Sequence, residues 1–103
     1  LDLFRDINVF LNQNKYIFNS ILLLSVIHHF IRQLGEEKTK KILSDLAFIT
    51  HKIIYECPKP GEPIIQEFGL VDFDFDKFII ESTGFKEKIR FKMNRDLVVL
   101  EKK

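Results

Sequence analysis

All three prolines of this chain lie in one short segment, Pro58-Lys59-Pro60-Gly61-Glu62-Pro63. Proline fixes its φ angle and donates no backbone hydrogen bond, so neither a regular helix nor a central strand can run through this segment. Before it, apolar residues recur at helical spacing; after it, they alternate as in a strand. The pattern predicts a single domain with a helical part, 1–57, a proline-rich turn, 58–63, and a sheet part, 64–103.

The helical part is predicted to contain one short helix and two long ones. The short helix covers residues 2–11. The first long helix runs from about 16 to 34, and Gly35 is suited to the left-handed conformation that ends a helix. The second runs from about 36 to 56. The apolar run at 21–27 is far shorter than the roughly 20 residues that cross a bilayer, so we expect no membrane association.

The sheet part is predicted to form an antiparallel meander of three or four strands. Val71, Phe73 and Phe75 alternate with aspartates, which is typical of a half-buried strand, and residues 78–81 begin the return strand. Two further strands are expected at 88–93 and 97–100, joined by a turn at 94–96. Hairpin-length connections favour antiparallel pairing, with the apolar face against the helices. The predicted fold class is therefore α+β, with the N-terminal helices packed on the meander.

The composition narrows the classes of partner and compartment. Sixteen basic and 15 acidic residues leave a formal charge of +1, so nucleic acid or an anionic surface could be attracted only by a local patch. The single cysteine, Cys57, cannot form an internal disulfide, which favours a reducing, cytoplasmic setting. Because the first residue is Leu1 and not methionine, we expect the chain to be part of a longer protein.

One apolar surface is predicted on the helices beyond what a single core requires. The residues assigned to it are Ile21, Leu22, Phe48, His51 and Tyr55. The first two lie where the first long helix is apolar on all sides, and the others form a second stripe on the following helix. We expect this surface to contact a second copy of the chain or a neighbouring domain, or to form the wall of a small apolar ligand site. The alternative is that these side chains pack under the sheet.

No group of residues has the spacing of a catalytic or metal site. Asp72, Asp74 and Asp76 would share one strand face and could bind a divalent cation, but no glycine-rich phosphate loop accompanies them. His28 and His29 are adjacent, so on a helix they point about 100 degrees apart and cannot both bind one metal without distortion. We therefore expect a non-enzymatic protein with no catalytic residue, metal or cofactor.

A basic strand offers the alternative function of nucleic-acid binding. Its residues are Lys86, Lys88, Arg90 and Lys92. The last three should lie opposite Ile89, Phe91 and Met93, with Phe91 pointing into the core, which leaves no surface aromatic ring to stack on a base. The aspartates at 72–76 could cancel the positive potential of this face. We expect no binding to nucleic acid at physiological salt.

Residues 25–56, SVIHHFIRQLGEEKTKKILSDLAFITHKIIYE, contain a helix that ends in Leu-Gly-Glu and a second helix. With Glu67-Phe68-Gly69-Leu70 before the predicted sheet, this stretch resembles 4-vinyl reductase domains and the related vesicle-tethering transport-particle subunits. The resemblance implies a pocket-forming regulatory domain for a small hydrophobic ligand, often beside a DNA-binding domain. Our leading hypothesis is a regulatory or interaction domain that dimerises or holds an apolar ligand between its helices and its sheet.

Overall fold

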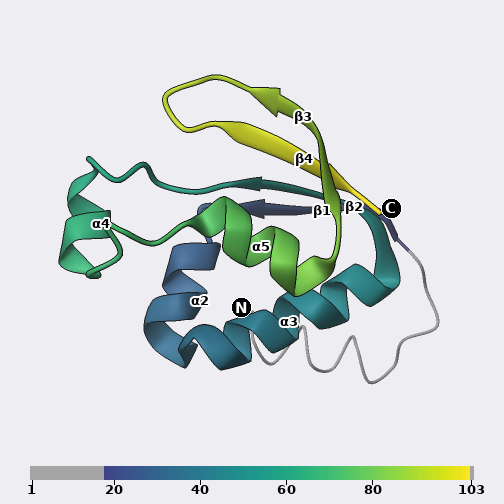
Figure 1. The fold of residues 1–103 in the computed structure, drawn as a ribbon, viewed down its shortest axis with the longest axis horizontal. Coiled ribbons are helices and arrows are strands. Elements are labelled where there is room, and N and C mark those ends of the chain that lie inside the picture. The colour runs from purple at the N-terminus through teal and green to yellow at the C-terminus, as the bar shows by residue number, and fades with distance from the viewer. Residues whose placement is uncertain (1–17, 103) are drawn as a thin grey trace.

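The computed structural model describes residues 18–102, which form a four-stranded sheet with helices packed against it. The strands are β1 (Phe18–Leu24), β2 (Thr50–Glu56), β3 (Lys86–Phe91) and β4 (Leu97–Glu101), and the helices are α2 (Ile27–Leu34), α3 (Glu36–Ile49), α4 (Pro63–Glu67) and α5 (Phe75–Thr83). The α+β class is confirmed. In Figure 1, α2, α3 and α5 lie on the same side of the sheet.

The sheet is mixed, with strand order β1-β2-β4-β3. Strand β1 runs parallel to β2, and α2 and α3 form the crossover between them. Strand β4 is antiparallel to both of its neighbours, β2 and β3. The predicted meander is thus right only for the β3–β4 hairpin, since β2, the other antiparallel neighbour of β4, lies in a segment predicted to be helical. A parallel pair requires a long crossover connection, and the helices between β1 and β2 provide it.

The core lies between the helices and the inner face of the sheet. Leu23, Ile53, Tyr55, Val98 and Leu100 point inward from the strands, and each is at most 5% exposed. Helices α2, α3 and α5 supply the opposing buried side chains: Ile27, Leu43 and Ile79. Burying one such aliphatic side chain stabilises the fold by about 1.5–3 kcal/mol. This buried layer holds the strands and helices in place relative to one another.

The predicted helix at 16–34 is wrong in its first half, because Phe18–Leu24 is strand β1. A short apolar run fits a buried strand as well as a buried helix, and parallel pairing with β2 decides the outcome here. Ser25 has φ +58° and separates β1 from α2. The predicted end at Gly35 is confirmed: its φ is +86°, and its N–H donates to the carbonyl of Ile31.

The predicted helix at 36–56 is wrong in its last third, because α3 ends at Ile49 and β2 begins at Thr50. Residues 50–56 contain β-branched and aromatic side chains, which pack well on a pleated sheet. Ile53 and Tyr55 are buried while Ile54 between them is less so, which is the alternation of a strand. Two of the four strands therefore lie before the prolines, in the part predicted to be helical.

The predicted strands at 71–75 and 78–81 are also wrong, because Phe75–Thr83 is helix α5. Asp74 caps this helix by accepting a hydrogen bond from the N–H of Lys77 at 3.0 Å. Phe75 and Ile79, one helical turn apart, are both buried. The aspartates at 72–76 therefore do not share a strand face. The predicted strands near 88–93 and 97–100 are confirmed as β3 and β4.

The predicted short helix at 2–11 lies outside the described residues. Among residues 18–102, no helix is both long and apolar enough to cross a membrane.

Candidate functional site

The carboxyl ends of the parallel strands β1 and β2 meet at one edge of the sheet. Ser25 follows β1 directly, and Glu56 is the last residue of β2. The backbone N–H of Ser25 donates to the carbonyl of Glu56 at 3.3 Å, so the two strand ends are joined. Open α/β sheets bind their ligands in the crevice outside the carboxyl ends of the strands. This edge is therefore the first place to look for a site.

A network of polar side chains occupies this edge, and we call it the strand-end cluster: Ser25, Glu56, Glu62 and Arg95. The hydroxyl of Ser25 donates to Glu56 Oε1 at 2.7 Å and accepts from Arg95 Nη1 at 2.6 Å. Arg95 Nη2 donates to Glu62 Oε1 at 2.7 Å. Arg95 reaches the cluster from the turn between β3 and β4, so the network connects three separate parts of the chain.

The charges of the strand-end cluster reinforce one another. The guanidinium of Arg95 holds the pKa of the Glu62 carboxyl below its usual value, and Glu62 in turn raises the pKa of Arg95. The side-chain hydrogen bonds that Glu56 accepts from Ser25 and Arg95 both end on Oε1. Glu56 also lines an open hollow of about 580 Å³ together with Glu62 and Arg95. The cluster can thus accept a hydrogen bond from a ligand without losing its internal pairs.

The backbone of Ser25 has a positive φ angle, which residues other than glycine rarely adopt. Ser25 is the only non-glycine residue with positive φ among those described. Such a conformation costs about 1–3 kcal/mol and persists where the surroundings fix it, often at functional sites. Here the bonds to Glu56 and Arg95 hold the hydroxyl of Ser25 at the strand end.

His28 lies in the first turn of α2, directly beyond this edge, and is 1% exposed. Its Nδ1 atom has no hydrogen-bond partner among the described residues. Burial lowers the pKa of His28 to about 4, with smaller contributions from His29 and Arg95, so the ring is neutral at pH 7. The rings of His28 and His29 are 4.2 Å apart between centroids. No set of three or more His, Cys, Asp or Glu residues within 18–102 has the arrangement of a metal site.

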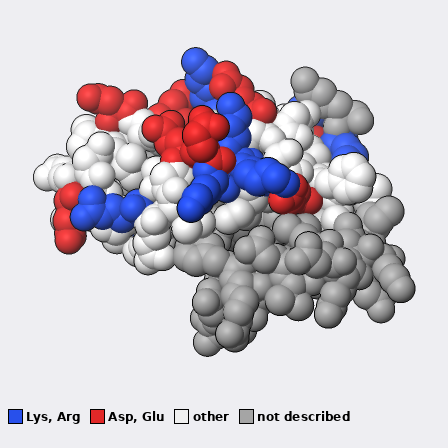
Figure 2. Space-filling view, turned by 90° about the horizontal axis from the view of Figure 1, so that it is seen from below, with Lys and Arg blue, Asp and Glu red and all other residues white. Residues whose placement is uncertain are grey.

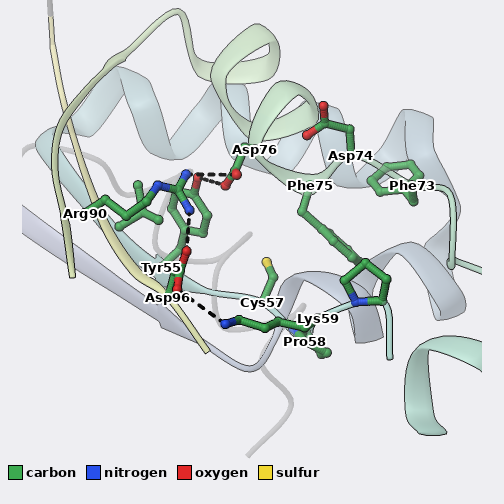
Figure 3. Close-up of a pocket in the computed structure, with 12 residues that line it drawn as sticks. Tyr55, Cys57, Pro58, Lys59, Phe73, Asp74, Phe75, Asp76, Arg90 and Asp96 are labelled. Atoms are coloured by element: carbon green, nitrogen blue, oxygen red, sulfur yellow. Dashed lines mark hydrogen bonds and ion pairs between the residues drawn. The ribbon is translucent and has the colours of Figure 1, made fainter. Parts of the chain in front are cut away.

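A second cavity lies between α5 and the inner face of the sheet, and we call it the α5 pocket (Figure 3). Its volume is about 310 Å³. The hydroxyl of Tyr55 donates to Asp76 Oδ1 at 2.5 Å, and Arg90 donates to Asp76 at 2.8 Å and to Asp96 at 3.1 Å. The apolar part of its lining includes Cys57, Pro58, Phe73, Phe75 and Val98. The pocket thus combines an apolar wall with one ionic network.

Burial and hydrogen bonding shift the pKa values of three groups that line the α5 pocket: Tyr55, Cys57 and Asp96. Burial, and then the hydrogen bond to Asp76, raise the pKa of Tyr55 above its usual value. Burial likewise raises the pKa of the Cys57 thiol, so this cysteine stays protonated and is a poor nucleophile. Bonds to Arg90 lower the pKa of Asp96 to about 2. At neutral pH Tyr55 and Cys57 therefore keep their protons, and the carboxylate of Asp96 is ionised beside Arg90.

The structure does not bring the predicted apolar surface together. Tyr55 is buried and lines the α5 pocket, Ile21 packs against the core, and Leu22 is 62% exposed on the outer face of the sheet. Phe48 is 80% exposed on α3, whereas His51 is exposed on β2. The predicted stripe fails because the chain changes from helix to strand between these two residues.

The predicted basic strand is largely paired with carboxylates. Arg90 points inward to Asp76, while Lys88 and Lys92 lie 3.2 Å from Glu101 and 3.4 Å from Asp96. Lys86 is exposed. Because of these pairs, the basic residues of β3 form no patch of a single sign. The face seen in Figure 2, from below the view of Figure 1, likewise has Lys and Arg side chains beside Asp and Glu.

The predicted inward orientation of Phe91 is wrong, since its side chain is 50% exposed. Arg90 lies opposite the buried Val98 in the register of β3 and β4, so the residues on either side of Arg90 must face outward. The ionic bonds of Arg90 to Asp76 and Asp96 stabilise the arrangement in which Arg90 faces inward and Phe91 faces outward.

The strand-end cluster was not predicted from the sequence. Its members are up to 70 residues apart, and only parallel pairing of β1 with β2 brings them together. The usable signal was Ser25, a polar residue placed directly after an apolar run and before a helix. Had that run been assigned to a strand, the rule for strand ends would have indicated this edge.

Comparison with known proteins gives similarity in structure only. No protein-family model and no curated protein matches the chain. A crystal structure of monomeric WbdD superposes with a TM-score of 0.71 at 25% identity, over 92% of this chain and 22% of that one. A structure described as the bifunctional kinase-methyltransferase WbdD gives 0.67 at 24% identity, over 93% of this chain. The chain spans about a fifth of the WbdD chains that it matches.

Proposed function

We propose that this chain is one part of a methyltransferase-type α/β domain, and that its strand-end cluster contacts the methyl donor. The similarity to WbdD, which is described as a kinase and a methyltransferase, supports an enzyme with one of these two activities. The sequence has neither the glycine-rich loop G-x-G-x-x-G nor the Asp-Phe-Gly motif of protein kinases. A parallel strand pair with a polar cluster at its carboxyl ends is typical of small-molecule sites in α/β enzymes, which favours the methyltransferase activity.

The observation that carries this proposal is the ring of hydrogen bonds joining Ser25, Glu56 and Arg95 at the carboxyl ends of β1 and β2. Both of these bonds to Glu56 end on its Oε1 atom, which leaves Oε2 to accept from a ligand hydroxyl or amine. A methyl donor such as S-adenosylmethionine carries both kinds of group. Arg95 neutralises part of the acidic charge of Glu56 and Glu62, which suits a polar ligand.

The test is the affinity of the intact protein that carries residues 1–103 for S-adenosylmethionine, measured by isothermal titration calorimetry. Glu56→Gln keeps an acceptor for Ser25 but removes the charge, and we expect its Kd to rise by about 10- to 100-fold, the effect of losing a hydrogen bond to a charged group. Glu101→Gln is the matched control, since Glu101 pairs with Lys88 on β3. Absence of binding by the unmodified protein, or equal effects of both variants, would contradict the proposal.

A regulatory domain that holds a small ligand is the second candidate, and the α5 pocket favours it. The pocket lies between a helix and the sheet, and its volume of about 310 Å³ is at the lower end of the usual range for ligand sites. The sequence resemblance to 4-vinyl reductase domains supports the same function. In this case the protein would be cytoplasmic, without enzymatic activity, and would associate with a second copy or a neighbouring domain. Native mass spectrometry would detect both a retained small molecule and the oligomeric state.

A further inference from the structure

The two outer strands of the sheet are built differently. Strand β3 carries charged side chains at Lys86, Glu87, Lys88 and Arg90 and has an irregular register between Glu87 and Ile89. Charges and bulges of this kind protect the edge strands of natural sheets from pairing with other chains. Strand β1, Phe18–Leu24, has no charged residue, no proline and no bulge. Its sequence is that of an interior strand, although no described strand pairs with its outer edge.

The outer face of the sheet, which carries two rows of apolar side chains, is also left without a partner among the described elements. Leu22, Ile54, Val99 and Ile89 are in register across all four strands and form one apolar row. The row beside it contains Leu24, Leu97 and Phe91, interrupted by Glu56. Helices α2, α3 and α5 lie on the other side of the sheet (Figure 1), and no described helix covers these rows.

The exposure of these rows is large for a face of a parallel pair. Leu22 is 62% exposed, Leu24 is 46% exposed and Phe91 is 50% exposed. Parallel strands are almost always covered on both faces, and their sequences are then apolar without interruption. Ile21-Leu22-Leu23-Leu24 fits that description, because side chains pointing to both faces are apolar. The sequence of β1 is therefore that of a strand whose outer face is covered.

We propose that β1 is a central strand of a larger sheet, and that its outer edge pairs in parallel with a strand from another part of the same polypeptide. A helix preceding or following that strand would cover Leu22 and Leu24. The parallel pairing of β1 with β2 would then continue across the sheet without a break. The WbdD chains on which this fold superposes have about four-fifths of their length outside the matched part, which is ample for such a unit. The inference rests on the strands themselves and holds whichever activity the protein has.

Amide hydrogen exchange of the intact protein tests the strand pairing. Alternate N–H groups of a strand point to opposite edges, so a strand paired only with β2 would leave every second amide of residues 20–24 unprotected. We expect all of these amides to be protected in the intact protein. Fast exchange of alternate amides would overturn the proposal, and this result requires no variant.

A charge substitution tests coverage of the outer face. Leu22→Lys in the intact protein should lower the melting temperature by about 5 °C or more, because it places an unpaired charge under the covering helix. Phe48→Lys is the control, since Phe48 is also apolar and 80% exposed but lies on α3; it should shift the melting temperature by less than about 2 °C. Equal, small shifts would overturn the proposal. So would dimerisation of the intact protein that Leu22→Lys abolishes, because a second copy would then cover the face.

Discussion

At the scale of single residues, burial determines which groups titrate as the protein unfolds. His28 has a pKa of about 4 in the folded chain and about 6.5 in a solvated one. Between these values the unfolded chain binds more protons, so the free energy of unfolding falls as the pH falls. The charged or titratable groups that influence the ring are His29, Arg95 and Glu62. The pKa values of Glu62 and Asp96 are lowered from about 4.5 and 3.8, so these groups act mainly at lower pH.

We therefore expect the free energy of unfolding to fall by about 2 kcal/mol between pH 7 and pH 5, measured by urea denaturation. His28→Leu should remove most of this pH dependence, because the leucine has no proton to gain. His29→Gln is the matched control at the exposed neighbour and should keep the dependence. If His28→Leu shows the same fall as the unmodified protein, the buried histidine is not its source.

Arg90 differs from the lysines beside it in the number of carboxylates it holds. It donates to Asp76, Glu87 and Asp96, and its side chain is 20% exposed. Arg90→Gln should therefore lower the free energy of unfolding by about 1–3 kcal/mol, because it removes the charged donor of Asp76 and leaves Asp96 with only its longer pairs to Lys59 and Lys92. Lys88→Gln, which breaks one exposed pair with Glu101, should cost about 0–1 kcal/mol. Equal losses in chemical denaturation would show that the inward position of Arg90 contributes nothing.

At the scale of elements, the N-terminal cap of α5 sets the wall of the α5 pocket. Asp74→Ala removes the acceptor for the N–H of Lys77 and should lower the free energy of unfolding by about 1 kcal/mol. Asp72→Ala is the control, since Asp72 is exposed in the preceding turn. Thermal denaturation followed by circular dichroism would measure both. A larger effect of Asp72→Ala would mean that the sequence-based strand at 71–75 describes the segment better than the helix does.

The elements predicted correctly were those with a local cause. Gly35 ends α2 because only a residue without a side chain adopts its φ easily, and the turn at 94–96 follows directly from two strand patterns. The others were missed where two local patterns compete. Residues 18–24 are apolar on both sides, which fits a buried helix or a buried strand. For α5, the alternation of Val71, Phe73 and Phe75 concealed the helix signals at Asp74 and Gly84.

The strand-end cluster could not be predicted for a related reason. Ser25, Glu56 and Arg95 come together only after the order of the strands is known, and no local pattern contains that order. Tyr55 was selected from the sequence, but for a helical surface and not for its bond to Asp76. Side chains from distant segments can be placed next to one another only when the pairing of the strands is known. Because the segments of β1 and β2 were predicted to be helical, the sequence analysis could not indicate the strand-end cluster.

At the scale of the whole molecule, the described residues present three different sides. One side carries the helices (Figure 1). Another is the outer face of the sheet with its exposed apolar side chains, and one end of the sheet carries the strand-end cluster. Glu56 belongs to the strand-end cluster and also lies in the outer row beside Leu24, so a covering unit must leave the carboxyl end of β2 open for a ligand to reach Glu56. On that condition the proposed methyl-donor site and the proposed larger sheet are compatible in one protein.

The distribution of charge over the molecule predicts that it does not bind nucleic acid. The formal charge is +1, and Lys88, Arg90 and Lys92 each lie within 4 Å of a carboxylate. A protein gains affinity for DNA when its Lys and Arg side chains neutralise phosphates, because each neutralised phosphate releases about one counterion. Side chains that are already paired with carboxylates neutralise few phosphates. We expect no change in the fluorescence anisotropy of a labelled duplex at physiological salt with micromolar protein. Micromolar binding whose log Kd depends on log salt with a slope of about 3–4, and which Lys86→Gln with Lys88→Gln abolishes, would contradict this expectation and restore nucleic-acid binding through β3 as the function.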